Sequence, residues 1–392
     1  MLSKIEFDKI QKECRSHELE CDKFTLAKET NSVQLEQKEV SSRFKPVFIR
    51  GCTNEWPKLE KIFQNLEAHS SEKRLNSLDN AALIGCNMIK DLTSGEFIHL
   101  SGIKSEDYLL KSYSPGYSGY QLSLDEEKTN IYYKKGNGLS ISGTALIIHG
   151  YEADNYGSFI FRCLPQLLLA KELNLNFDYF IIPKRTLWAM QAISLLDFGV
   201  KPILAHNEVQ GLQLERCKYI QTCDNQGFFS SQDVRRIRTF CESLWQSSYS
   251  KDNCSENIYI SRRWSPSRTI FTRNLTSEAA IMQHLEPLGY NEIHSQLCSF
   301  KDQVNIFMRA KNIIGTSGSG LLNSMFAHPN TKVLELESIL ACTTQHANIY
   351  SSTGKSFSFF LGTQNPKTSE SLHPWSIDIN DFKHAVDHFH SY

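Results

Sequence analysis

Several patterns that would identify a chemistry directly are missing from this chain of 392 residues. Its eleven cysteines form no Cys-x-x-Cys pair, so neither a zinc ribbon nor a thioredoxin motif is supported. No Gly-x-x-x-x-Gly-Lys-Ser/Thr sequence occurs, and no Gly-x-Gly-x-x-Gly sequence follows a strand, which disfavours a P-loop enzyme and an NAD-dependent dehydrogenase. No Asp-x-Asp pair is present, so we expect no diphosphate site that is bridged by a metal.

Long apolar runs and a one-sided charge are also absent. The N-terminal segment is charged and lacks the apolar run of a signal peptide, and no window approaches about 18 uncharged apolar residues. The net charge of -1 gives no global field that would steer the chain to nucleic acid. We expect a cytoplasmic protein with buried free thiols, peripheral contact with the inner membrane as an option, and no cofactor, metal or nucleic acid.

Apolar runs alternate with helical patterns from residue 140 onward. This alternation predicts an α/β fold in which parallel strands are covered by helices. A polar segment at residues 246–257 separates two such units. The predicted strands are residues 45–50, 145–149, 178–182, 201–204, 257–261, 312–314 and 332–336, and the predicted helices are residues 187–198, 277–288, 300–310 and 378–390.

These patterns divide the chain into four predicted parts. Residues 1–140 form an N-terminal accessory region that contains strands. Residues 141–250 form a first Rossmann-like half, residues 251–375 form a second, and residues 376–392 form a C-terminal helix with an apolar stripe.

The segment from Asn312 to Asn323 reads as a strand, a glycine-rich turn and the start of a short helix. Its three glycines allow the backbone to turn tightly and to point several N–H groups at one place. This order predicts an anion at the helix start, and a purely structural turn is the alternative. The candidate ligands are Ser317, Gly318, Ser319, Gly320 and Asn323.

Charged side chains also follow strand ends. Arg262, Arg263 and Arg268 come after a predicted strand, at the edge where ligands gather in open α/β sheets, and guanidinium groups suit a pyrophosphate. Glu335 is placed at the end of another strand, where a carboxylate accepts hydrogen bonds from a ribose diol. The alternatives are a solvated basic loop for the arginines, and a surface acid or a partner for a nearby arginine for Glu335.

A third group of polar residues opens the helix of the first half. Glu152 and Asp154 are the candidate acid/base groups there, and Asn155, Tyr156 and Ser158 follow at the predicted mouth of this half. A helix cap or a core hydrogen bond is the alternative role for each of them.

Taken together, these stretches resemble glycosyltransferase family 61. The family segment Asn-Tyr-x-His-Phe-Leu-x-Asp/Glu-x-Leu-Pro-x-Leu reads Asn-Tyr-Gly-Ser-Phe-Ile-Phe-Arg-Cys-Leu-Pro-Gln-Leu at residues 155–167. A strand ending in Ser-Arg-Arg occupies residues 258–263. The family's Gly-x-His-Gly-Ala-Gly-Leu-x-Asn, Phe-x-x-Pro and Glu correspond to residues 315–323, residues 326–329 and Glu335.

The resemblance implies a GT-B-like pair of Rossmann-like halves that face a cleft, with the donor nucleotide on the C-terminal half. It implies an inverting, metal-independent hexosyl- or pentosyltransferase that uses a nucleotide sugar, most often a UDP-sugar. The acceptor is a glycan or a lipid-linked glycan in bacterial capsular or surface polysaccharide synthesis. Arg262, Arg268 and the amides of the glycine loop then stabilise the leaving diphosphate.

The chain departs from the family at three positions. Ser158 replaces the histidine of the first motif, Arg162 replaces its acid, and Ser317 replaces the histidine of the glycine loop. Asp154 and Glu152 are then the remaining candidates for the catalytic base. The alternative function is a catalytically impaired partner protein that binds a nucleotide sugar.

Overall fold

The computed structural model describes residues 19–27, 32–84, 87–101, 122–124, 130–134, 139–150, 152, 155–209, 211–222, 227–246, 255–262, 275–338, 343–364 and 374–392. The chain divides into two compact units. The first unit contains Met1–Glu39 and Ser71–Asn225, and the second contains Val40–Ser70 and Gln226–Tyr392.

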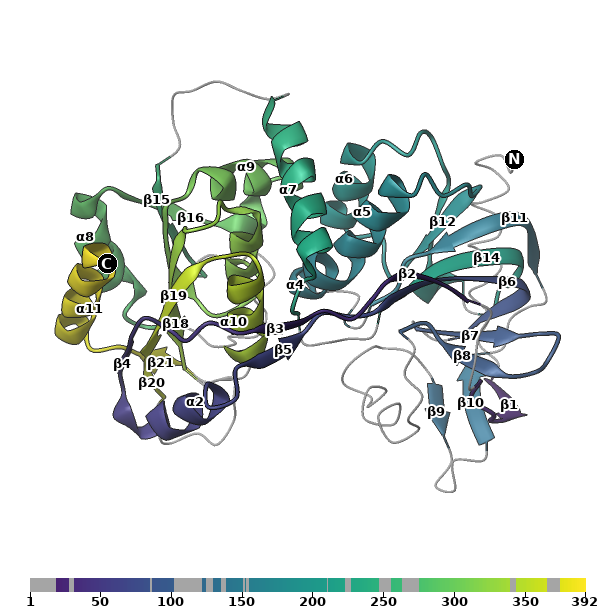
Figure 1. Cartoon of the computed structure of the whole chain (residues 1–392), viewed down its shortest axis with the longest axis horizontal. Helices are drawn as coiled ribbons and strands as arrows, with labels where there is room; N and C mark the ends of the chain where they lie inside the picture. The colour runs from purple at the N-terminus through teal and green to yellow at the C-terminus, as the bar shows by residue number, and fades with distance from the viewer. Residues whose placement is uncertain are drawn as a thin grey trace. The chain divides into compact units, whose positions relative to one another are not determined.

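A mixed sheet forms the centre of the first unit, in the order β13-β12-β11-β14-β6-β7-β8, and β2 also pairs with β6 (Figure 1). The first four strands of this order are mutually parallel, and β6, β7 and β8 continue the sheet antiparallel. The strands are β2 (Ser32–Glu36), β6 (Lys73–Ile84), β7 (Met88–Asp91), β8 (Phe97–His99), β11 (Ser140–Ile147), β12 (Tyr179–Ile182), β13 (Ile203–Ala205) and β14 (Gln213–Thr222).

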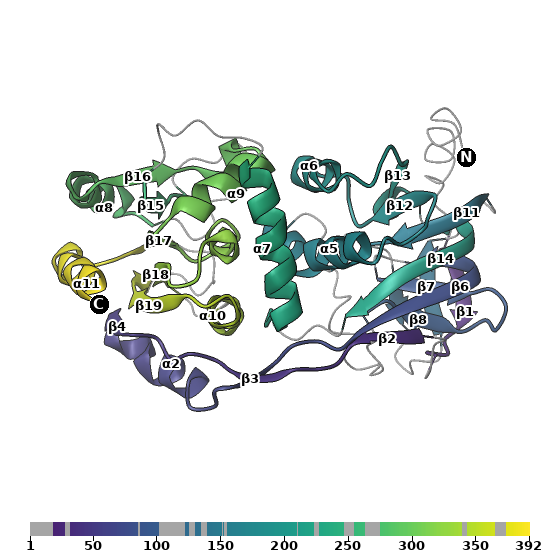
Figure 2. The same ribbon diagram turned by 45° about the horizontal axis from the view of Figure 1, so that its top comes forward.

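Helices connect the parallel strands of this unit (Figure 2). The first connection runs through α4 (Tyr156–Ser158), a π-helical segment η2 (Phe159–Cys163) and α5 (Leu164–Glu172). Pro165 explains the π segment, because proline has no N–H and its ring clashes with the carbonyl four residues before it in an α-helix. Further elements of the unit are α6 (Leu187–Leu195), η3 (His206–Glu208), β1 (Leu19–Lys23), β9 (Leu122–Leu124) and β10 (Asn130–Lys134).

The second unit is built on a parallel sheet in the order β16-β15-β17-β18-β19-β4. The edge strand β4 comes from the N-terminal part of the chain. The strands are β4 (Ile49–Gly51), β15 (Asn257–Ile260), β16 (Tyr290–Ile293), β17 (Asn312–Thr316), β18 (Lys332–Glu337) and β19 (Ser356–Leu361), with the short pairs β3 (Val40–Ser42) to β5 (Glu67–His69) and β20 (Thr363–Gln364) to β21 (Trp375–Ser376) beside them.

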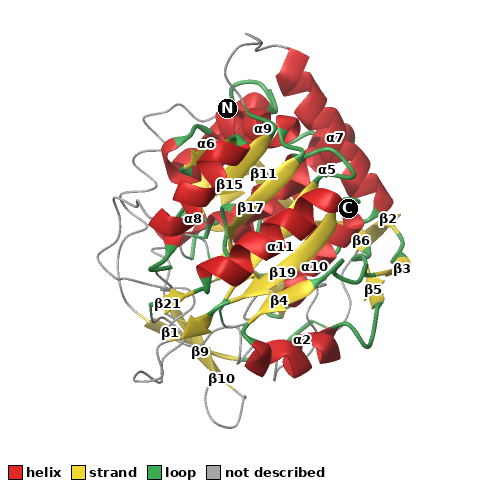
Figure 3. Ribbon diagram, turned by 90° about the vertical axis from the view of Figure 1, so that its left-hand side faces the viewer, coloured by secondary structure: helices red, strands yellow, loops and turns green. Residues whose placement is uncertain are grey.

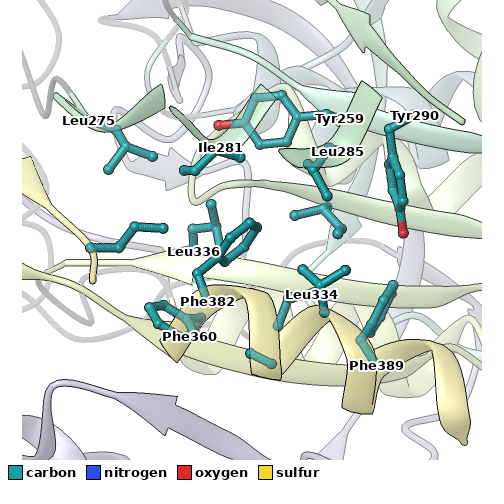
Figure 4. Close-up of a cluster of buried hydrophobic side chains, with 14 of the residues drawn as sticks. Tyr259, Leu275, Ile281, Leu285, Tyr290, Leu334, Leu336, Phe360, Phe382 and Phe389 are labelled. Atoms are coloured by element: carbon teal, nitrogen blue, oxygen red, sulfur yellow. The ribbon is translucent and has the colours of Figure 1, made fainter. Parts of the chain in front are cut away.

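Helices cover both faces of this parallel sheet (Figure 3). The pair α8 and α11 packs on one face through an apolar core, which Figure 4 shows. On the other side α10 contacts β19, and α7 and α9 contact the segment η6. The helices are η1 (Thr53–Glu55), α2 (Trp56–Ile62), α7 (Ser231–Gln246), α8 (Glu278–Leu285), η4 (Glu286–Leu288), η5 (Ser295–Leu297), α9 (Phe300–Arg309), η6 (Leu321–Phe326), α10 (Thr343–Ser352) and α11 (Ile379–Ser391).

The mixed α/β class and its parallel strands confirm the prediction at that level. The apolar stripe of the last predicted helix is confirmed as well, since Phe382, Ala385, Val386 and Phe389 of α11 are all buried. The GT-B-like arrangement of the two halves stays a prediction. In the part of the chain that the structure describes, no helix is long and apolar enough to cross a membrane.

The compact units group some segments differently from the predicted four parts. Residues 40–70 join the second unit through β4, whereas they were predicted in the accessory region. Residues 226–250 also group with the second unit, and β6 to β8 extend the sheet of the first. As a division into independently folding domains, the four parts stay a prediction.

Candidate functional site

The strand order of the second unit reverses between β15 and β17. The chain goes from β15 outward to β16 on one side, and then through β17, β18 and β19 on the other. In open parallel sheets, such a reversal leaves a crevice at the carboxyl ends of the two central strands, where ligands bind. Arg262 follows β15 and the glycine loop follows β17, so the structure brings these two predicted motifs to one place.

Arg262 is held between α8 and the glycine loop. Its Nη1 donates a hydrogen bond of 2.8 Å to the carbonyl oxygen of Ser317. Its backbone N–H donates to Oε1 of Glu278 at 3.0 Å. Glu278 is buried and also accepts a hydrogen bond from the hydroxyl of Tyr259. Glu278 thus fixes the start of the arginine segment, a role that its position in the first turn of a predicted helix did not reveal.

Close packing explains the glycines of the loop. Gly318 has a φ of +149°, and an added Cβ would lie 2.9 Å from Nη1 of Arg262. An added Cβ at Gly315 would lie 2.8 Å from Cβ of Ile260, and one at Gly320 would lie 3.3 Å from Cγ2 of the same residue. The glycines therefore let the loop approach both β15 and the guanidinium group.

The loop also carries donors that the described protein groups do not use. The hydroxyls of Thr316 and Ser317 are buried and make no hydrogen bond within the described ranges, and the same is true of Ser295 in η5, whose side chain lies near Gly320. The backbone N–H groups of Gly318 and Gly320 likewise donate to no described acceptor. Because buried polar groups are nearly always paired, a cluster of unused donors beside a guanidinium favours a ligand with several acceptor oxygens.

Two other residues that were predicted to bind the nucleotide-sugar donor lie inside the protein. Asn323 is fully buried, and its Nδ2 donates to Oε1 of Gln303 at 2.7 Å, which ties η6 to α9. Glu335 is also fully buried. It lies inside β18, which continues to Glu337, whereas the sequence predicted Glu335 at the end of its strand. That either side chain contacts the nucleotide-sugar donor stays a prediction.

Both carboxylate oxygens of Glu335 are engaged by α10. Nδ1 of His346 lies 2.8 Å from Oε1, and the hydroxyl of Tyr350 donates to Oε2 at 2.8 Å. Burial and the nearby charge of Glu335 raise the pKa of Tyr350 well above its usual value, so the phenol keeps the proton that it donates. In this structure Glu335 anchors α10 against the sheet.

Three predicted residues lie outside the described residues, namely Arg263, Arg268 and Asp154. Their predicted roles stay predictions. Ser319 lies in the glycine loop and is partly exposed.

The first unit has its own reversal of strand order, between β11 and β14. Beyond the carboxyl end of β11 the structure places a pocket that includes two predicted residues, Glu152 and Asn155, and two that sequence reasoning missed, Lys184 and Trp188. The remaining lining is Ile148, Phe159, Cys163, Leu167, Ile182, Pro183 and Ala189. The signal for the missed residues is their place directly after the predicted strand at residues 178–182.

Glu152 and Asn155 form a small bonded unit at this pocket. The side chain of Asn155 donates to Oε2 of Glu152 at 3.1 Å, and its backbone N–H donates to the carbonyl of Glu152 at 2.8 Å. Oδ1 of Asn155 accepts from the N–H of Ser158, so Asn155 is also the helix cap. Glu152 has a φ of 53°, a left-handed conformation that is unfavourable for a residue with a side chain.

Ser158 and Arg162 contact each other one turn apart. Nη1 of Arg162 donates to Oγ of the buried Ser158 at 2.9 Å, and the guanidinium lies 4.5 Å from the ring centre of Phe161. Tyr156 packs edge-on against Trp188, with ring centres 5.7 Å apart. The positions where the family has a histidine and an acid are thus occupied by a serine and an arginine that bond to each other.

His149 lies just after the carboxyl end of β11, and its side chain is buried. Its Nε2 lies 2.9 Å from the carbonyl oxygen of Ile220 on β14, and its Nδ1 lies 3.4 Å from the hydroxyl of Ser101. Burial lowers the pKa of His149 to about 4, so the ring is neutral near neutral pH. Burial likewise raises the pKa of the Cys163 thiol to about 12, which keeps it in the unreactive form.

Among the residues that the structure describes, no group of three or more His, Cys, Asp and Glu side chains is arranged to hold a metal ion. No curated protein matches the chain. The model of the family described as Glycosyltransferase 61 does match, over residues 156–334, from the helix after Glu152 to the middle of β18. This segment contains Arg262 and the whole glycine loop, and its similarity to family 61 supports glycosyltransferase activity.

Proposed function

We propose that this chain transfers a sugar from a nucleotide-sugar donor, a UDP-sugar, to a glycan or lipid-linked glycan acceptor. The transfer inverts the anomeric centre and needs no metal ion. It serves bacterial surface polysaccharide synthesis, in the cytoplasm or at the cytoplasmic face of the membrane. The observation that carries the proposal is the bond from Arg262 to the glycine loop at the strand-order reversal of the second unit, within the segment that matches family 61.

The donor diphosphate fits the groups at this crevice. A guanidinium offers forked donors to phosphate oxygens, and the unused N–H groups of Gly318 and Gly320 add two more. The hydroxyl of Ser317 completes the set. When the bond between the sugar and the diphosphate breaks, these fixed donors stabilise the charge that develops on the leaving group.

The bonded pair of Glu152 and Asn155 in the first unit supports proton removal from the acceptor. The acceptor hydroxyl attacks the anomeric carbon, a new carbon–oxygen bond forms as the bond to the diphosphate breaks, and the hydroxyl proton passes to a base. We assign Glu152 as that base. Asn155 holds one of its oxygens, and strained backbone of the kind seen at Glu152 concentrates at functional sites. Trp188 gives the pocket an apolar wall.

A second candidate function is nucleotide-sugar binding without transfer. The bonded pair of Ser158 and Arg162 favours it, because neither side chain replaces a histidine and its acidic partner as a proton acceptor. The two functions share the crevice at the carboxyl ends of β15 and β17, called the donor crevice below. They differ in whether Glu152 removes a proton from the acceptor.

The donor crevice is tested by the thermal shift of the full chain with UDP. We expect UDP to raise the melting temperature, and we expect Arg262→Ala to weaken binding by about 1.5–3 kcal/mol, since a charge-assisted contact is lost. Lys311→Ala, which removes an exposed cation of the same unit, is the matched control and should keep wild-type affinity. Equal affinity in wild type and Arg262→Ala would place the diphosphate elsewhere.

Turnover separates the enzyme from the binding protein. With a panel of UDP-sugars we expect slow release of UDP by wild type, and a loss of about 100-fold or more in Glu152→Gln, because an amide does not accept the proton. UDP affinity should be unchanged in this variant. Glu172→Gln, at the exposed end of α5, is the control. If wild type binds UDP but no donor and acceptor pair is turned over, the binding function stands.

A further inference from the structure

A second pocket lies at the amino-terminal edge of the sheet in the second unit. Its residues precede β17, β18 and β19 or belong to α7, whereas the donor crevice lies at the carboxyl ends of β15 and β17. The five residues of β17 separate the two edges by about 16 Å. The lining is Val234, Ile237, Arg238, Cys241, Glu242, Met308, Met325, Phe326, Ala327, His328, Thr353 and Lys355.

Lys355 occupies an unusual position for a lysine. Gly354 ends α10 with a φ of +75°, and the N–H of Lys355 donates to the carbonyl of Tyr350 at 2.8 Å. This is the pattern of a Schellman motif, in which the position of Lys355 commonly holds a hydrophobic residue that packs back on the helix. Here the side chain is only 1% exposed although it ends in an amine. The helix end therefore does not require this amine.

The amine of Lys355 has little compensation from the protein. Its Nζ donates one hydrogen bond, of 2.8 Å, to the carbonyl of Thr353, and no ion pair joins it to a carboxylate within the described residues. Burial, and then the charge of Arg238, lower the pKa of Lys355 to about 7, while the Cys241 thiol acts weakly in the opposite direction. Without a counter-charge, protonation of this buried amine is costly.

The other titratable groups of the pocket come from two elements. Arg238, Cys241 and Glu242 lie on α7, and His328 lies in the turn before β18. The lining thus holds two basic side chains, a histidine and one carboxylate, and Arg238, Glu242 and His328 are exposed. Ile237, Met308 and Phe326 also line the pocket, and these apolar side chains are buried.

We propose that this pocket binds a small oxyanion, a phosphate or carboxylate group, between the amine of Lys355 and the guanidinium of Arg238. The anion accepts hydrogen bonds from the two remaining N–H groups of a protonated Lys355 and from the forked donors of Arg238. The anion supplies a negative charge beside Lys355, with which no described carboxylate forms an ion pair. Lys355 therefore takes up a proton when the anion binds. The proposal does not depend on the transferase function.

The test is isothermal titration of the full chain with inorganic phosphate and with acetate, at about pH 8, in two buffers of different ionisation enthalpy. At this pH Lys355 is mostly neutral, so binding should take up close to one proton. In Lys355→Met we expect binding to weaken about tenfold or more and the proton uptake to vanish. The variant should fold at least as stably as wild type, because it restores a hydrophobic residue to this position.

Two further variants keep the outcome clear. Arg238→Gln lies at the exposed rim, so it should fold even if Lys355→Met does not, and it should weaken the anion while leaving UDP affinity unchanged. Lys311→Met removes an exposed cation and should change nothing. The proposal is wrong if neither anion binds, or if binding and proton uptake persist in Lys355→Met. Preference for phosphate over acetate, or the reverse, identifies the oxyanion.

Discussion

At Gly318 a single missing side chain determines how the candidate donor site is built. The backbone there has a φ of +149°, and the place of a Cβ lies 2.9 Å from Nη1 of Arg262. Gly289 offers a comparison in the same unit. Its φ is +80°, and nothing lies closer than 4.0 Å to an added Cβ. Alanine at either position meets backbone strain, but only at Gly318 does it also displace the guanidinium.

We therefore expect different results from these two alanine variants. Gly289→Ala should lower the free energy of unfolding by about 1 kcal/mol and leave the affinity for UDP unchanged. Gly318→Ala should lower stability by a similar amount or more and also weaken UDP binding by about tenfold. Chemical unfolding and UDP titration measure the two effects separately. Similar UDP affinities in both variants would show that Arg262 does not depend on its contact with Gly318.

At the scale of secondary-structure elements, α11 shows how a helix far along the chain supports the donor-side sheet. Its buried face, Phe382, Ala385, Val386 and Phe389, joins one core with residues of β15, β17, β18 and β19 (Figure 4). The ring of Phe382 packs edge-on against Phe360 of β19, with ring centres 5.7 Å apart. The element thus covers strands whose carboxyl ends carry the glycine loop and Arg262.

Removing the ring of Phe382 should destabilise this unit strongly. We expect Phe382→Ala to lower its free energy of unfolding by about 3–5 kcal/mol, because a fully buried aromatic side chain leaves a cavity. Lys383→Ala, one residue further on the exposed face, should change it by less than about 0.5 kcal/mol. Denaturant unfolding followed by a probe in the second unit checks the pair. A small effect of Phe382→Ala would mean that α11 is not docked in solution.

The first turns of the helices in the first unit show where local patterns sufficed. Asn155 and Thr186 each accept an N–H of the turn that they begin, as cap residues do. The cap role of Asn155 was one of the two alternatives that the sequence left open. The π segment after it was not predicted, because its cause is the placement of Pro165 within a helix that tertiary packing keeps continuous.

At the scale of the whole molecule, buried histidines determine how the first compact unit is expected to respond to acid. The first unit buries His99 and His149, which are 3% and 1% exposed. Burial lowers the pKa of His99 to about 3 and that of His149 to about 4. Both values lie below the usual value of 6.5, so the unfolded chain binds protons there that the folded unit does not.

The stability of the first unit should therefore fall as the pH falls from about 6.5 towards 4. At about pH 5 each of the two histidines should contribute a loss of about 2 kcal/mol relative to neutral pH. In His149→Gln, whose amide can still donate to the carbonyl of Ile220, the pH dependence should shrink by about that amount. Urea unfolding at about pH 7 and pH 5 measures it. The same pH dependence in both proteins would contradict neutral burial of His149.

The sequence by itself determined the class of the fold and most strand and helix positions from residue 140 onward, because apolar periodicity and local caps reside in neighbouring residues. It also named Arg262 and the glycine loop, since glycines and arginines after strand ends are visible in order along the chain. It did not indicate several elements of the two central sheets and their helices, namely β6, β14, β16, β19, α7 and α10.

Only the tertiary structure decided what these residues contact. It placed Arg262 against Gly318, which are 56 positions apart in sequence, by making β15 and β17 neighbours. It turned Glu335 inward to His346 and Tyr350, and it brought β4 from the N-terminal part to the edge of the second sheet. It also buried the amine of Lys355 at a helix end. Strand order and burial depend on contacts between distant segments, which local periodicity does not contain.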